Sequence, residues 1–142
     1  MALAIDTTTT VAAPQDAVWR ALTDWSLAHR WMPGVTTMRG PLEPGAVVTF
    51  TVRGADRTAV VEVLDPPRAL ALLSRSGPVT AVYTYTLAAR PGGTTLRLVA
   101  DVVVRGALRP MAPVIRRSIA KEDGVQPERL RALVEEVSRP AG

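Results

Sequence analysis

The sequence predicts an α+β fold: a seven-stranded antiparallel sheet covered on one side by a C-terminal helix, with two short helices between the first and second strands. Turn signals recur at short spacing through the middle of the chain, and the segments between them alternate apolar and polar residues. The last third of the chain carries apolar residues at helical spacing. We expect residues 1–142 to form a single domain, because this length buries a core without disulfides or structural metals.

The N-terminal third predicts one strand followed by two short helices. Residues 3–11 keep apolar side chains in one phase among threonines that favour extended backbone. Pro14 suits the first turn of a helix, where its missing N–H costs nothing. Asp24 can cap a second helix from residue 25 to about residue 30, and Pro33 and Gly34 end this helix.

The region after residue 35 predicts an antiparallel meander, because its strand-like segments are joined by short connections. The turn signals are PLEPG (41–45), RGADR (53–57), DPPR (65–68), RSGP (75–78) and RPGG (90–93). In VTAVYTYTL (79–87) the odd-numbered residues form the more apolar face, which includes Tyr83 and Tyr85. Such one-sided strands are typical of a sheet with one face covered.

The C-terminal segment predicts the covering helix, with a break in it. One stripe at helical spacing contains Ile115, Ile119, Leu130, Leu133, Val134 and Val137. The stripe stays in register across EDGVQPE (122–128), but Gly124 and Pro127 disfavour a continuous helix there. We therefore expect one helix from residue 110 to about residue 123 and a second that starts near Pro127.

Composition excludes several kinds of site. The chain has no cysteine and one histidine, which leaves no thiol nucleophile and no recognisable metal-ligand set, so we expect neither a metal nor a cofactor. The net charge is +4, and all but one of the 17 basic residues are arginine. These arginines do not alternate with aromatic residues on a strand, so we expect no nucleic-acid partner. Their only local cluster contains Arg105, Arg109, Arg116 and Arg117.

Segments for targeting or membrane insertion are not recognisable in the sequence. The N-terminus has no basic region followed by a long apolar run, and no later stretch approaches about 20 apolar residues. We expect no membrane span, a cytoplasmic location, and a monomer or a homodimer.

At this point the sequence resembles the polyketide cyclase/dehydrase-like branch of the START-related helix-grip superfamily, which includes the birch-pollen allergens. The resemblance is carried by VAAPQDAVWRALTDWSLAHRWMPGV (11–35), VVEVLDPPRALAL (60–72), YTYTLAARPGGTTLRL (83–98), GALRPMAPVIRR (106–117) and LRALVEE (130–136). It implies a curved seven-stranded sheet around a long C-terminal helix, with an apolar cavity between them.

The inward residues also favour a cavity on physical grounds. A helix held by a curved sheet fills the concave side only if the facing side chains are large, and many of them here are alanine, valine or glycine. A mostly apolar pocket with a few polar groups is the usual form of a small-molecule site. The residues that we expect to bind the ligand are Trp31, Phe50, Leu72, Tyr83, Tyr85, Leu98, Met111 and Ile115. Trp31 fits the cavity lining and the core equally well.

Three residues are candidates for catalysis. Tyr83 and Tyr85 share the inferred inner face, where their hydroxyls either orient a carbonyl group or reach the surface from the core. His29 is the only ready general acid or base, although a helix-end surface position also explains it. Arg57 and Arg75 follow and precede turns from which they can meet an anionic ligand at a cavity rim.

Three functions remain open. The first is binding of an apolar small molecule such as a polyketide, a lipid or another secondary metabolite. The second is a polyketide cyclase or dehydratase that catalyses enolisation and ring closure with Tyr83, Tyr85 and His29. The third is a chaperone-cofactor-like interaction module, suggested by ALTDWSLAHRW (21–31) alone. The break near Gly124 either lies at the cavity mouth and helps admit ligand or is a kink that fits the helix to the curved sheet. Alanine at Gly124 and Pro127 should straighten the segment, raise its thermal stability and, if the break admits ligand, slow ligand exchange.

Overall fold

The computed structural model describes residues 2–137 and confirms the helix-grip fold. Its elements are β1 (Leu3–Val11), α1 (Gln15–Thr23), η1 (Trp25–Leu27), α2 (Ala28–Trp31), β2 (Val35–Arg39), β3 (Val47–Val52), β4 (Ala55–Asp65), β5 (Ala69–Ser76), β6 (Val79–Arg90), β7 (Gly93–Val104), η2 (Gly106–Met111), α3 (Ala112–Asp123) and α4 (Gln126–Val137). The first strand matches its predicted bounds. The second short helix is split into a 3-10 turn and one α-helical turn, and Asp24 caps it by accepting a hydrogen bond from the backbone N–H of Ser26 at 3.1 Å.

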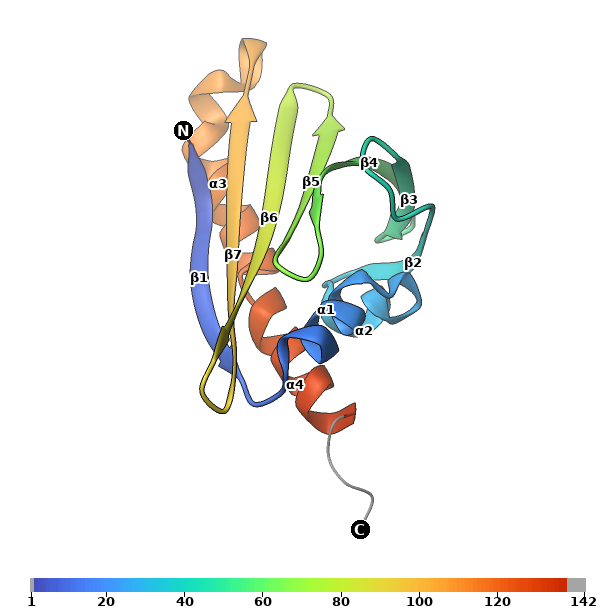
Figure 1. Ribbon diagram of the computed structural model, residues 1–142. Helices are drawn as coiled ribbons and strands as arrows, with labels where there is room; N and C mark the ends of the chain where they lie inside the picture. The colour runs from blue at the N-terminus through green and yellow to red at the C-terminus, as the bar shows by residue number, and fades with distance from the viewer. Residues whose placement is uncertain (1, 138–142) are drawn as a thin grey trace.

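The seven strands form one antiparallel sheet in the order β1-β7-β6-β5-β4-β3-β2. Strands β2 to β7 are therefore a meander, and β1 joins its far edge beside β7. Figure 1 shows the sheet curling away from β5 through β4 and β3, with α3 and α4 along its concave side. Register shifts in β1, β2 and β4 contribute to this curvature, because an extra residue in one strand bends the strand.

The start of β7, where it meets the end of β1, requires a glycine. A Cβ atom on Gly93 would lie 2.1 Å from the backbone oxygen of Val11, a distance that no side chain tolerates. Nearby, the buried Thr94 hydroxyl donates to the Ala13 carbonyl oxygen at 2.8 Å. The backbones of β1 and β7 therefore lie in direct contact at this point, and this contact positions α1, which follows β1 in the chain.

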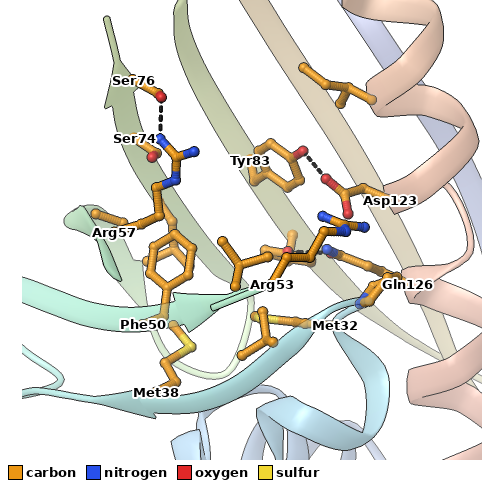
Figure 2. Close-up of a pocket in the computed structure, with 17 residues that line it drawn as sticks. Met32, Met38, Phe50, Arg53, Arg57, Ser74, Ser76, Tyr83, Asp123 and Gln126 are labelled. Carbon is orange, nitrogen blue, oxygen red and sulfur yellow. Dashed lines mark hydrogen bonds between the residues drawn. The ribbon is translucent and has the colours of Figure 1, made fainter. Parts of the chain in front are cut away.

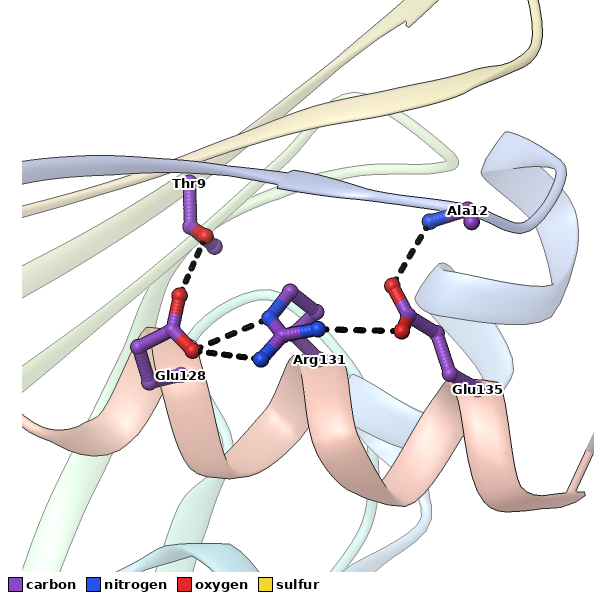
Figure 3. Close-up of polar contacts among 5 residues, drawn as sticks. All are labelled: Thr9, Ala12, Glu128, Arg131 and Glu135. Atoms are coloured by element: carbon purple, nitrogen blue, oxygen red, sulfur yellow. Dashed lines mark hydrogen bonds and ion pairs between the residues drawn. The ribbon is translucent and has the colours of Figure 1, made fainter.

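Polar contacts tie α4 to β1, as Figure 3 shows. Arg131 donates to Glu128 at 2.8 Å and to Glu135 at 3.0 Å, so it holds both carboxylates on one side of the helix. Glu128 accepts from the Thr9 hydroxyl at 2.7 Å, and Glu135 accepts from the backbone N–H of Ala12 at 2.9 Å. Most of these contacts are exposed, so they set the position of α4 against β1 more than they stabilise the fold, since surface ion pairs contribute little.

The apolar core lies between the concave face, the short helices and α4. Trp31 is 1% exposed, and its ring packs edge-on against Tyr85 with centroids 5.6 Å apart. Leu130, Leu133 and Val134 of α4 are buried as the apolar stripe predicted. Val137, on the same predicted stripe, is 69% exposed, because the end of α4 faces a groove beside α1.

The predicted break in the C-terminal helix is present. Helix α3 ends at Asp123 and α4 begins at Gln126, which places Pro127 in the first turn of α4. Gly124 serves a different purpose from the one expected. A Cβ atom there would lie 2.4 Å from the Ala120 carbonyl oxygen, so alanine would force the backbone apart rather than stabilise the segment.

Candidate ligand pocket

A cavity of about 320 Å³ lies between the concave face of the sheet and the junction of α3 with α4. Strands β2 to β6 form its walls, and the end of α2 and the helix break complete them. Most of the lining is apolar: Met32, Pro33, Val35, Met38, Phe50, Val52, Ala59, Leu72 and Ile119. The polar lining residues are Arg53, Arg57, Ser74, Ser76, Tyr83, Tyr85, Asp123 and Gln126. Such a lining suits a small, largely apolar molecule that carries a few polar groups.

Two hydrogen bonds cross from the sheet to the helix break. The Tyr83 hydroxyl donates to Asp123 Oδ2, a contact visible in Figure 2. The Tyr85 hydroxyl, which is buried, donates to Gln126 Oε1 at 2.6 Å. Alternation along β6 aims both tyrosines inward, and the break presents one acceptor on each side of itself. The pocket therefore has a polar wall of two phenols, a carboxyl group and an amide.

Burial controls the electrostatics of this wall. It raises the pKa of the Asp123 carboxyl above its usual value, and the neighbouring Glu122 charge acts in the same direction, while the hydrogen bond from Tyr83 opposes the rise. Burial and the Asp123 charge raise the pKa values of both Tyr83 and Tyr85. Both phenols therefore remain protonated donors at neutral pH, and Asp123 is a stronger base than an exposed aspartate.

Two arginines border the pocket on the side of the β3–β4 turn. Arg53 pairs with Glu122 of α3 at 3.2 Å, which links this turn to the last turn of the helix. Its left-handed backbone, with φ of 49°, lets its side chain lie against Gly34, where a Cβ atom would meet the arginine at 3.1 Å. Arg57 donates to the Ser76 hydroxyl on β5. Arg75, the other predicted rim residue, does not belong to the lining.

Four of the residues predicted to bind ligand line this pocket: Phe50, Leu72, Tyr83 and Tyr85. The other four lie elsewhere. Trp31 and Leu98 are core residues at 1% and 0% exposure, Ile115 packs in a small cluster with Val102, and Met111 is 46% exposed on η2. Of the predicted catalytic residues, the structure brings together the two tyrosines. His29 is exposed on α2 and is not part of the lining.

Sequence reasoning missed Asp123 and Gln126, which supply the acceptors of the polar wall. Both stand in EDGVQPE, which was interpreted only as a helix break. The missed signal was spacing: Asp123 follows Ile119 by four residues and so continues the apolar stripe, where a carboxyl group is out of place unless a polar partner faces it. The methionines at positions 32 and 38 were also missed.

The fold and the pocket together define a helix-grip protein with a largely apolar pocket between the sheet and the helix break. Residues 2–137 match the family model "Polyketide cyclase / dehydrase and lipid transport", which spans nearly the whole chain. The chain belongs to this family, as the resemblance noted in the sequence implied. No curated protein sequence matches the chain.

Solved structures share the fold at low sequence identity. The Zhui aromatase/cyclase from Streptomyces sp. R1128 is 24% identical, with a TM-score of 0.77 over 97% of this chain and 96% of that one. Protein MLL2253 from Mesorhizobium loti is 21% identical, with a TM-score of 0.76 over 95% and 98%. The di-domain ARO/CYC StfQ from the steffimycin biosynthetic pathway is 13% identical, with a TM-score of 0.75 over 94% and 51%.

Within residues 2–137, none of the helices has the length and apolar character required to cross a bilayer.

Proposed function

We propose that this chain, as a single domain, binds a small molecule of the polyketide class in the cavity between the sheet and the helix break. The observation that carries the proposal is an apolar cavity of about 320 Å³ with one polar wall. Phe50 and Leu72 offer flat and branched apolar surface to a ring system, and the phenols of Tyr83 and Tyr85 offer hydrogen-bond donors to a carbonyl oxygen. Family membership and the similarity to aromatase/cyclase structures support this ligand class.

Displacement of an environment-sensitive apolar dye by aromatic polyketides and by lipids tests this binding. Ser74→Phe fills the cavity from β5, whereas Thr86→Phe places the same ring at an exposed position on β6. We expect Ser74→Phe to abolish saturable dye binding and Thr86→Phe to leave it unchanged. Equal binding by both variants would show that the dye occupies another site, and displacement by lipids alone would contradict the polyketide class.

The Tyr83–Asp123 pair favours a second function, catalysis of enolisation and ring closure. A raised pKa makes the Asp123 carboxylate a suitable base for the acidic proton between two carbonyl groups. On binding, the Tyr83 hydroxyl would turn its hydrogen bond from Asp123 to the carbonyl oxygen that becomes the enolate. The enolate carbon then forms a bond to a second carbonyl carbon of the same chain, and the resulting alkoxide takes the proton back from Asp123.

This mechanism predicts that Tyr83→Phe and Asp123→Asn slow cyclisation of a poly-β-ketone by about 10²-fold or more while dye binding persists. His29→Ala is the matched control, because His29 lies outside the lining and we expect no change there. Unchanged turnover in Tyr83→Phe and Asp123→Asn would leave binding as the function. The chaperone-cofactor alternative stays a prediction that a pull-down from lysate tests.

A further inference from the structure

An arginine-bordered apolar surface lies on η2 and the start of α3, away from the pocket lining. It consists of Arg105, Leu108, Arg109, Met111, Val114 and Arg117. Leu108, Met111 and Val114 are 45%, 46% and 54% exposed. They stand three residues apart, and in a 3-10 helix that leads into an α-helix such a spacing aligns side chains on one side. Three aliphatic side chains therefore project into solvent together.

The charged residues of the segment 105–117 are all arginines. Arg105, Arg109 and Arg117 are exposed, and within residues 2–137 no carboxylate lies within ion-pair distance of any of them. Arg116 points inward instead and donates to the Val102 carbonyl oxygen at 3.0 Å, which anchors the first turns of α3 on β7. The surface is therefore held on a rigid element, and its positive charge is not neutralised from within the described chain.

This surface lies at the same end of the molecule as the β5–β6 turn. The Arg105 backbone N–H donates to the Pro78 carbonyl oxygen at 3.0 Å, and Ser76, two residues earlier, lines the pocket. Figure 1 shows the ends of β5 and β7 and the start of α3 at the top of the sheet. A molecule that enters or leaves the pocket beside Ser76 would thus do so close to whatever covers η2.

We propose that this surface docks the protein on an anionic lipid membrane. Aliphatic side chains on a helical segment with arginines around them are typical of interfacial segments, which insert apolar groups among the acyl chains and pair cations with the headgroups. An acidic protein would supply the same negative charge. Among the residues that carry most of the energy of protein interfaces, however, tryptophan and tyrosine are enriched and leucine and valine are under-represented, and two of the three projecting side chains here are leucine and valine. The proposal goes beyond the proposed function and does not depend on it.

Flotation of the full chain with vesicles of phosphatidylcholine, with and without 30% phosphatidylglycerol, tests the proposal. We expect binding to the anionic vesicles only. Arg105→Gln with Arg109→Gln should weaken it about 25-fold, since each cation near an anionic surface contributes about 1 kcal/mol and 1.4 kcal/mol is tenfold. The matched control replaces Arg39 and Arg129, two exposed arginines on β2 and α4, and should bind almost as well as the wild type.

Apolar insertion has a separate readout. Leu108→Ser with Met111→Ser should weaken binding about tenfold or more at fixed charge, whereas Val47→Thr with Val63→Thr, at exposed strand positions, should leave it unchanged. Circular dichroism establishes that each variant is folded. Failure to bind anionic vesicles would overturn the proposal, as would equal binding by the serine variant. Binding to soluble polyglutamate but not to vesicles would assign the surface to an acidic protein instead.

Discussion

The hydrogen bond between Tyr85 and Gln126 allows a sharp test of how the helix break is held. Both side chains are buried, at 2% and 5% exposure, and the bond is 2.6 Å long. Tyr85→Phe keeps the ring and its edge-on contact with Trp31 but leaves the Gln126 amide oxygen without its donor. A buried polar group without a partner costs about 1–3 kcal/mol, so we expect the free energy of unfolding to fall by about 2 kcal/mol.

Gln126→Leu removes the other half of the pair and should cost a similar amount, because the Tyr85 hydroxyl then has no acceptor. In the double variant neither polar group remains, so its loss should be about 1 kcal/mol or less and the two single losses should not add. Urea denaturation followed by tryptophan fluorescence measures the free energy of unfolding of the wild type, the two single variants and the double variant. Tyr83→Phe is the control: its acceptor Asp123 is only half-buried, so water replaces the lost hydroxyl and the cost is smaller.

A double variant that loses the sum of the two single losses would refute this reasoning. The hydrogen bond would then contribute nothing specific, and the packing of each side chain alone would account for the stability of the break.

Four further predictions concern charges and close backbone approaches. Burial raises the pKa of Asp123 in the folded state above its unfolded value of 3.8, so the folded state binds more protons than the unfolded chain. The free energy of unfolding therefore falls as pH rises between the two pKa values, and Asp123→Asn should remove that fall in thermal unfolding measured from pH 3 to 8. For Glu128 the pH dependence of stability has the opposite sign. The hydrogen bond from Arg131 lowers the pKa of Glu128 below 4.5, so stability is lost as pH falls, and Arg131→Gln should reduce the loss of stability at acid pH in the same measurements. Gly124→Ala should cost about 1–3 kcal/mol in urea denaturation, because its Cβ atom would meet a backbone oxygen at 2.4 Å; a gain would restore the original expectation for this glycine. Gly93→Ala should cost at least as much by the same measurement, since the corresponding distance to β1 is 2.1 Å, and an unchanged midpoint would show that β1 shifts freely.

The fold could be predicted because its signals are local. Alternation along the strands, the turn signals between them and the cap at Asp24 each depend on a few neighbouring residues, and the structure places them where expected. The break before Gln126 followed from the cost of glycine and proline inside a helix.

The site could be predicted only in part, because it depends on distances between elements. The phase of β6 placed Tyr83 and Tyr85 on the inner face, but strand phase says nothing about which helix residue meets them. Asp123 and Gln126 became visible as partners only when the helix was set against the sheet. Leu98 has the same inward phase as the tyrosines, yet it lies in the core, since α4 covers that end of the sheet and leaves the other open.

The position of β1 beside β7 has a consequence for how the protein folds during its synthesis. Leu3 pairs with Asp101, so the first strand leaves the ribosome long before its partner is synthesised. The meander from β2 to β7 assembles through neighbouring hairpins, each of which closes a short loop. The apolar face of α1, with Val18, Trp19 and Leu22, packs in a region where α1 contacts β6, β7 and α4, so its cover is complete only after α4 has been translated. Part of this face therefore stays exposed on the nascent chain until the last helix is made, and during that time aggregation competes with folding.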